Sequence, residues 1–136
     1  MTGRVVVGYD GSEDAVRAQR WAAAHARAIG VGLEIVHAYD YPYLDRLGVD
    51  LRRELRDEAL AVVHDGLRLV TDAEPAVTAT VVVEVGEPGA VLVGRCTDAD
   101  HLVVGRRGVR GAHPGTLGSV APRCLHRAPG SVTVIR

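Results

Sequence analysis

Five short apolar runs alternate along this chain with segments of helical periodicity, and this alternation limits the folds that it can adopt. The first run, at residues 4–9, is rich in valine and ends at the turn residues 10–12. The alanine-rich segment Glu13–Ile29 follows, with small residues three and four apart, and Gly30 ends it. Because the runs are apolar throughout, we predict strands that are buried on both faces, as in a parallel sheet.

The same pattern continues to the end of the chain. Further strands are predicted at Leu33–Tyr39, 78–85, 101–104 and Ser131–Ile135, and helices at 49–70, 89–97 and 119–127. The helix at 49–70 carries an apolar stripe from Leu51 to Val70, whereas residues 40–48 and 105–118 are predicted as loops. Strands that alternate with helices indicate an α/β fold, and the length suits a single domain spanning residues 1–136.

Composition excludes several kinds of enzyme. The chain has no lysine, so it can form neither a Schiff base nor the lysine contact of a Walker-type phosphate loop. A phosphoacceptor receiver domain also needs a lysine, together with an aspartate at the end of the third strand, where the only nearby acid is Glu84. No Ser-His-Asp set can be assembled from the spacing of these residues. The sequence therefore offers no catalytic residue.

Charge is divided unevenly along the chain. Residues 1–100 contain 10 arginines and all 17 acids, a balance of −7, whereas residues 101–136 contain 6 arginines and no acid, a balance of +6. The net charge of −1 argues against a general nucleic-acid binder. The basic third of the chain nevertheless suits a small anionic ligand, because arginine makes bidentate contacts with phosphate.

Neither a membrane span nor a secretion signal is expected. No apolar run approaches the roughly 20 residues of a membrane helix, and the first residues lack the pattern of a signal peptide. We therefore expect a cytoplasmic protein without membrane partners. Cys96 and Cys124 stand alone, with no CxxC pair, and are expected to be reduced core residues rather than metal ligands.

The glycine-rich segment before the last helix carries the strongest functional signal. Gly105 and Gly108 are followed, after nine residues, by Gly118 and Ser119. Phosphate binding requires free backbone N–H groups and no Cβ that blocks close approach, and this segment leads into a predicted helix N-terminus, which favours anions. The hydroxyl of Ser119 can add a donor. The alternative is that these glycines only serve a long turn.

With these residues in place, the sequence resembles the universal stress protein family, and specifically its ATP-binding branch. The resemblance covers the whole chain and rests on residues 5–26, 35–39, 86–93 and 101–136. The branch carries the motif G-x2-G-x9-G-[ST], which Gly105, Gly108, Gly118 and Ser119 match in full. The resemblance implies a Rossmann-like fold, with a five-stranded parallel sheet of strand order 3-2-1-4-5 and helices on both faces.

The resemblance also implies a set of nucleotide-binding residues. Around the adenine and ribose these are Gly8, Tyr9, Asp10 and Ala38, with the Ala38 backbone pairing with the adenine edge. The residues expected over the nucleotide are Val104 and Gly105, and those approaching the ribose and phosphates are Arg107 and Gly108. The phosphates themselves are expected at Gly118, Ser119, Val120 and Ala121.

In function, the resemblance implies a dimeric stress-response protein that binds ATP, with Mg²⁺ or Mn²⁺, and acts through its bound state. The dimer is expected to form through the last strand, Ser131–Ile135. Any hydrolysis is expected to be slow, because no lysine and no paired carboxylates face the phosphates. Two alternatives remain open: a binding module for AMP or cyclic AMP, and a nucleotide-free dimerisation protein in which the glycines are structural.

Two departures from the family pattern concern the phosphate end. Ala121 stands where some members carry a hydroxyl, and the interior of the loop contains a less typical His113-Pro114-Gly115. Both leave the number of bound phosphates open. At the other end, Tyr39, Tyr41 and Tyr43 can form a wall of an adenine pocket or a plain surface loop.

Several polar residues have a structural explanation beside the functional one. Asp10 precedes Gly-Ser at a strand end, where an aspartate often serves only a turn or a helix cap. Arg106, Arg107 and Arg110 are candidates for one phosphate contact, and of these we favour Arg107. His37 lies inside a predicted strand and is expected to be a hydrogen-bonded core residue rather than a base.

Overall fold

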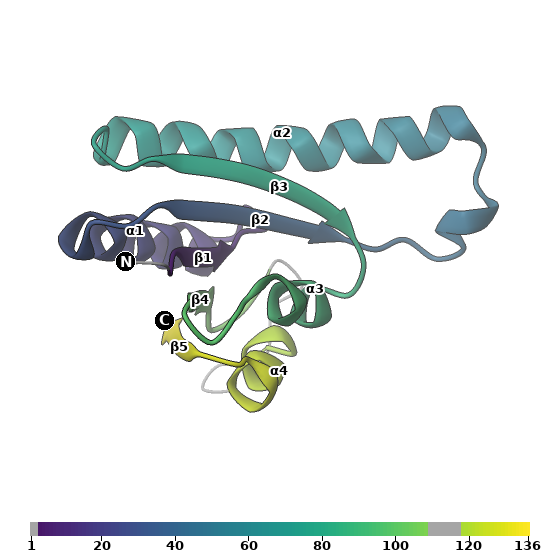
Figure 1. Cartoon of the computed structure of the whole chain (residues 1–136). Helices are drawn as coiled ribbons and strands as arrows, with labels where there is room; N and C mark the ends of the chain where they lie inside the picture. Colours follow the sequence, from purple (N-terminus) through teal and green to yellow (C-terminus); the bar gives the residue numbers. More distant parts are fainter. Residues whose placement is uncertain (1–2, 109–117) are drawn as a thin grey trace.

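The computed structural model describes residues 3–108 and 118–136. Within them, a five-stranded parallel sheet lies between two pairs of helices (Figure 1). In chain order the elements are β1 (Val5–Gly8), α1 (Glu13–Ile29), β2 (Leu33–Tyr39), the 3-10 turn η1 (Leu44–Arg46), α2 (Val49–Ala73), β3 (Ala79–Val85), α3 (Pro88–Arg95), β4 (His101–Gly105), α4 (Val120–Arg127) and β5 (Ser131–Ile135). The strand order is β3-β2-β1-β4-β5, which confirms the predicted fold class and sheet order.

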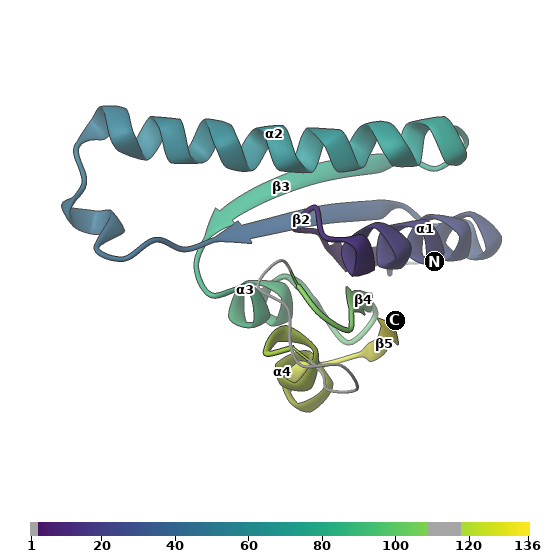
Figure 2. The ribbon, with the colours of Figure 1, turned by 180° about the vertical axis from the view of Figure 1, so that it is seen from behind.

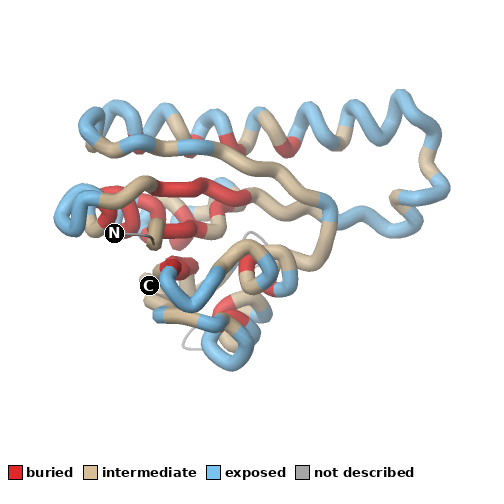
Figure 3. Tube along the Cα trace, viewed as in Figure 1, coloured by how far each residue is buried: buried red, intermediate tan, exposed pale blue. Residues whose placement is uncertain are grey.

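The pleat of β1 divides its valines between the two helix layers. Val5 and Val7 pack into the core formed with α1 and α2, whereas Val6 packs into the core formed with α3 and α4. All three valines are fully buried, and Figure 3 shows burial concentrated along the central strands and the helix faces turned toward them. A strand with apolar residues on both faces therefore lies at the centre of the sheet, as the sequence pattern predicts.

The ends of α1 agree with the sequence, but the end of α2 does not. Ser12 caps α1, because its Oγ accepts a hydrogen bond from the N–H of Ala15 at 3.2 Å, and Gly30 ends it at a φ of 72°. The prediction that the second helix stops at Val70 is wrong, because one more polar turn carries it to Ala73. The helix stops where Pro75 disfavours helical backbone at the residue before it.

The N-terminal part of α2 extends past the carboxyl ends of β2 and β3 (Figures 1 and 2). Only the second half of the predicted stripe therefore reaches the core: Ala59 and Val70 are buried, but Leu51 is 43% exposed. None of the helices in the described ranges combines the length and hydrophobicity that a membrane span requires.

Candidate functional site

A cavity of about 790 Å³ opens where β1, β2 and β4 end and where α3 and α4 begin. The chain crosses there from one side of the sheet to the other, since β1 pairs with both β2 and β4. This switch point is where open parallel sheets bind ligands. The residues predicted for the site all line this one cavity: Gly8, Tyr9, Asp10, Ala38, Val104, Gly105, Arg107, Gly108, Gly118, Ser119, Val120 and Ala121.

Asp10 serves a turn and also faces the start of the glycine-rich loop. Its Oδ1 accepts a hydrogen bond from the N–H of Ser12 at 3.0 Å, which is the turn predicted as the structural explanation. Its Oδ2 points toward Gly108, where an added Cβ would lie only 2.8 Å away. The turn therefore orients the carboxylate, and Gly108 leaves the space that the carboxylate occupies.

Arg107 is anchored to α1 by a buried acid that the sequence did not reveal as part of the site. Its N–H donates to Oδ2 of Asp14 at 3.1 Å, and its Nε lies 3.4 Å from the same oxygen. Asp14 is only 5% exposed and also pairs with Arg17. The buried carboxylate therefore neutralises part of the charge that Arg107 brings to the cavity.

Three helices begin beside the cavity, and they differ in how their N-termini are capped. The Ser12 hydroxyl caps α1, and the Glu87 carboxylate caps α3 by accepting from the N–H groups of Gly89 at 2.9 Å and Ala90 at 2.8 Å. The N-cap of α4, Ser119, has helical backbone and makes no side-chain capping bond within the described part of the chain. The start of α4 therefore offers first-turn N–H groups and a partial positive charge to a ligand.

Glu87 also adds a negative charge to the cavity wall. Its Oε2 lies 3.1 Å from Nη1 of Arg123 on α4, and the two side chains join the starts of α3 and α4. The first turn of α3 is thus occupied by an anion of the protein itself. An anionic ligand is directed to α4 instead.

The opposite end of the cavity is aromatic and carries a neutral histidine. Nδ1 of His37 lies 2.9 Å from the carbonyl oxygen of Tyr9, so this nitrogen carries the hydrogen and donates it. Burial lowers the pKa of His37, although the Tyr9 carbonyl and Asp10 act in the opposite direction. The prediction that His37 is hydrogen-bonded is confirmed, but its placement in the core is wrong, because the residue is half-buried and lines the cavity.

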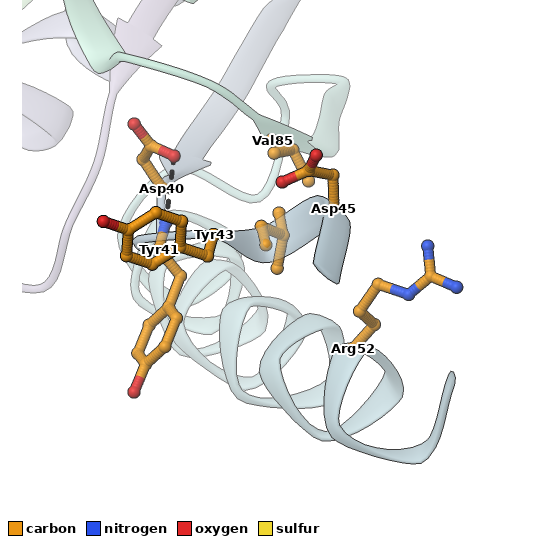
Figure 4. A pocket seen from close by; sticks show the side chains of 7 residues that line it. Asp40, Tyr41, Tyr43, Asp45, Arg52 and Val85 are labelled. Carbon is orange, nitrogen blue, oxygen red and sulfur yellow. Dashed lines mark hydrogen bonds between the residues drawn. The ribbon is translucent and has the colours of Figure 1, made fainter. Parts of the chain in front are cut away.

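The three tyrosines Tyr39, Tyr41 and Tyr43 all lie on this cavity. Tyr41 and Tyr43 are 48% and 69% exposed, so they form a wall of the cavity and part of a surface loop at once. They also line a smaller cavity of about 470 Å³ beside the first, together with Asp40 (Figure 4). Asp40 accepts a hydrogen bond from the N–H of Tyr41 at 2.9 Å, drawn as the dashed line in Figure 4.

Sequence reasoning missed the residue that holds the loop and addressed others that the structure does not describe. Glu87 and Pro88 line the cavity, as their position directly after a predicted strand indicates. Asp14 carried no such signal, because it lies in a helical segment far from the loop that it holds. The predictions for Arg110 and for His113-Pro114-Gly115 lie outside the described residues.

The arrangement combines a pocket of aromatic and small residues with an anion-binding end. Within residues 3–108 and 118–136, no group of three or more His, Cys, Asp or Glu side chains is placed to hold a metal ion. The described residues are therefore suited to bind a molecule with a flat apolar part and a negatively charged part.

Comparison with a family model and with a curated relative points to the same family. A model of the universal stress protein family matches residues 1–136. A Thermus aquaticus relative, described as the universal stress protein in QAH/OAS sulfhydrylase 3'region, is 31% identical over 147 residues, which cover 97% of each chain.

Two solved structures of universal stress proteins share this architecture. One, in complex with cAMP, is 30% identical, with a TM-score of 0.71 over 98% of this chain and 97% of that chain. The other, from Archaeoglobus fulgidus in complex with dAMP, is 24% identical, with a TM-score of 0.71 over 98% and 97% of the two chains. The second likeness supports the fold alone.

Proposed function

The chain belongs to the universal stress protein family, and from this premise we propose that it binds an adenine nucleotide in the cavity between β1, β2 and β4. The motif formed by Gly105, Gly108, Gly118 and Ser119 favours ATP as the ligand. AMP and cyclic AMP are the second candidates, because the 30% identical relative was solved with cAMP.

The observation that carries the proposal is the uncapped start of α4. Phosphate oxygens accept hydrogen bonds from backbone N–H groups, and Ser119, Val120 and Ala121 lie together on the cavity at that point. Pro122 follows in the first turn, where its missing N–H costs nothing. Gly118 allows close approach, because among the described residues the atom nearest to an added Cβ is the carbonyl oxygen of Arg106, at 3.4 Å.

The base would lie at the other end, near Ala38 and the tyrosines. The backbone of Ala38 follows the buried part of β2 and is held in the sheet by pairing with Glu84 of β3. A divalent ion would be held by the phosphates, with Asp10 as the acid beside them. That ion would offset the charge of the phosphates. The described residues favour stable binding over turnover, because the cavity offers no lysine and His37 is already hydrogen-bonded.

The proposal includes a homodimer formed through β5. Among the described strands, this strand is at the edge of the sheet and pairs only with β4, so its outer backbone groups can pair with a second copy of the chain. Sedimentation analysis should give twice the chain mass at micromolar concentration. A monomer under these conditions would contradict the dimer but not the nucleotide site.

Titration calorimetry with ATP, ADP, AMP and cyclic AMP, with and without Mg²⁺, tests the ligand. We expect a dissociation constant below the millimolar range for at least one nucleotide. Gly118→Val should raise this constant about tenfold or more, because the branched side chain would fill the approach to α4. Gly94→Ala is the control, because no described residue lies within 4 Å of a Cβ added at Gly94. Absence of binding by the wild type would favour the nucleotide-free alternative.

A further inference from the structure

The two arginines at the start of the glycine-rich loop have different environments. Arg107 donates its backbone N–H to Asp14 at 3.1 Å and places its Nε 3.4 Å from the same carboxylate oxygen. Asp14 is 5% exposed, so the side chain of Arg107 is the partner of a buried negative charge. This arginine already has a structural function in the folded chain.

Arg106 lines the same cavity, but its side chain has no such partner. Its Nε is buried and makes no hydrogen bond within the part of the chain that the structure describes. No ion pair involves it among the described residues either. A buried cationic donor without an acceptor is unfavourable, and an anion in the cavity would satisfy it.

The backbone of Arg106 is held on both sides. Its N–H donates to the carbonyl of Ile135 at the end of β5 at 2.8 Å, and its carbonyl accepts from the N–H of Gly118 at 2.8 Å. The second bond connects Arg106 directly to the residue that leads into the uncapped start of α4. The backbone of Arg106 and the residue that precedes the N-cap of α4 are therefore joined by one hydrogen bond, and both residues line the same cavity.

We propose that Arg106 is the side chain that contacts the anionic group of the bound ligand, and that Arg107 is a structural residue held by Asp14. This assignment rests on the proposed function and names the residue that binds the phosphate of the ligand. The other charged groups on the cavity fit this division: Glu87 caps α3 and pairs with Arg123, and one oxygen of Asp10 is held by Ser12. The ligand class is a phosphate ester, whose oxygens match the fork of an arginine.

Arg106→Gln and Arg107→Gln, each titrated with AMP and with adenosine, test the assignment. Adenosine lacks only the phosphate, so the ratio of AMP to adenosine affinity reports the contact with the phosphate. In Arg106→Gln we expect the affinity for AMP to fall on the order of tenfold or more, as for loss of a charge-assisted hydrogen bond. The affinity for adenosine should stay within about twofold. In Arg107→Gln we expect the ratio of AMP to adenosine affinity to stay close to that of the wild type.

The outcomes separate the assignment from the proposed function. A wild-type chain that binds AMP, with an unchanged AMP-to-adenosine ratio in Arg106→Gln, would overturn the assignment and leave the proposed function standing. A selective loss of AMP in Arg107→Gln alone would reverse the two roles. A wild-type chain that binds neither AMP nor adenosine would overturn the assignment, and one that also fails to bind ATP, ADP and cyclic AMP would overturn the proposed function as well. If Arg106→Gln does not fold, Arg106→Lys keeps the charge without the fork, and a smaller selective loss of AMP is expected, whereas equal losses of both ligands would contradict a phosphate contact.

Discussion

Gly105 lies so close to Asp14 that a Cβ on the glycine would stand 2.9 Å from the carbonyl carbon of the aspartate and 3.0 Å from its Cβ. The end of β4 thus packs directly against the first turn of α1. The same aspartate holds the backbone of Arg107, two residues further along. The start of the glycine-rich loop is therefore fixed by α1 as well as by the sheet.

Gly105→Ala should destabilise the fold. The added Cβ would meet the backbone of α1, which cannot move aside as the end of a flexible side chain can. We expect the free energy of unfolding to fall by about 1–3 kcal/mol, as for overpacking of a close contact. Urea denaturation measures this change. Gly94→Ala in α3 is the control, with a free energy of unfolding that is unchanged or raised by up to about 1 kcal/mol, and equal losses in both variants would contradict the contact.

Asp14→Asn should destabilise the fold and weaken the attachment of Arg107 to α1. The substitution removes the charge that Arg17 and Arg107 share, and it leaves Arg107 without its carboxylate. We expect a loss of about 1–3 kcal/mol in the free energy of unfolding. Asp65→Asn is the matched control, because the Asp65–Arg68 pair is exposed and should contribute less than about 1 kcal/mol. A loss in Asp14→Asn no larger than in this control would show that the buried pair is not stabilising.

Stability should fall as the pH is lowered from 7.5 toward 5.5. Burial lowers the pKa of His37, and burial together with the charge of His25 lowers the pKa of His101. The unfolded chain, with imidazoles near the ordinary value of 6.5, takes up protons first, so acid favours unfolding. The contribution of the two histidines is present above pH 6.5 and is lost as the pH falls toward the lowered pKa values.

The double variant His37→Asn, His101→Gln tests whether these two histidines cause the pH dependence of stability. These amides keep a polar group near Nδ1 of His37, which bonds to Tyr9, and near Nε2 of His101, which lies 2.7 Å from Oγ1 of Thr133. Urea denaturation at pH 7.5 and 5.5 should show a smaller pH difference in the variant than in the wild type. Equal differences would assign the effect to other groups.

The two cysteines should react slowly in the folded protein. Burial raises the pKa of both Cys96 and Cys124 from 9.0 to about 11, and Cys124 is fully buried. Because the thiolate is the reactive form, the rate with Ellman's reagent at pH 8 should be on the order of 100-fold below that of a free thiol. The rate should rise to the ordinary value in denaturing urea, and Cys96 should react before Cys124. Immediate reaction of either thiol in the native protein would contradict this burial.

The period of the apolar pattern determined most of the fold. The bounds of α1, β2 and β5 agree with the sequence to the residue, because the apolar periods and the turn residues that mark these ends are local features. The location of the cavity follows from the order of strands and helices, since parallel strands place their carboxyl ends at one edge of the sheet. The glycines and Ser119 could therefore be assigned to one site before any contact was known. The exposure of Leu51 was not predictable in this way, because it depends on where the sheet stops. The end of α2 before Pro75 was a local signal that the apolar stripe alone does not show.

Only the tertiary structure distinguished the environments of Arg106 and Arg107. In the sequence they are identical neighbours, and the family resemblance favoured Arg107 for the phosphate contact, which we now propose for Arg106. Their difference arises because Asp14, on a helix 93 residues away in the chain, is buried against one of them and not the other. The sequence alone determined the fold class and the glycine motif, because periodicity and backbone freedom are local properties. The partners of individual charges depend on which distant elements pack together, and the structure alone decided them.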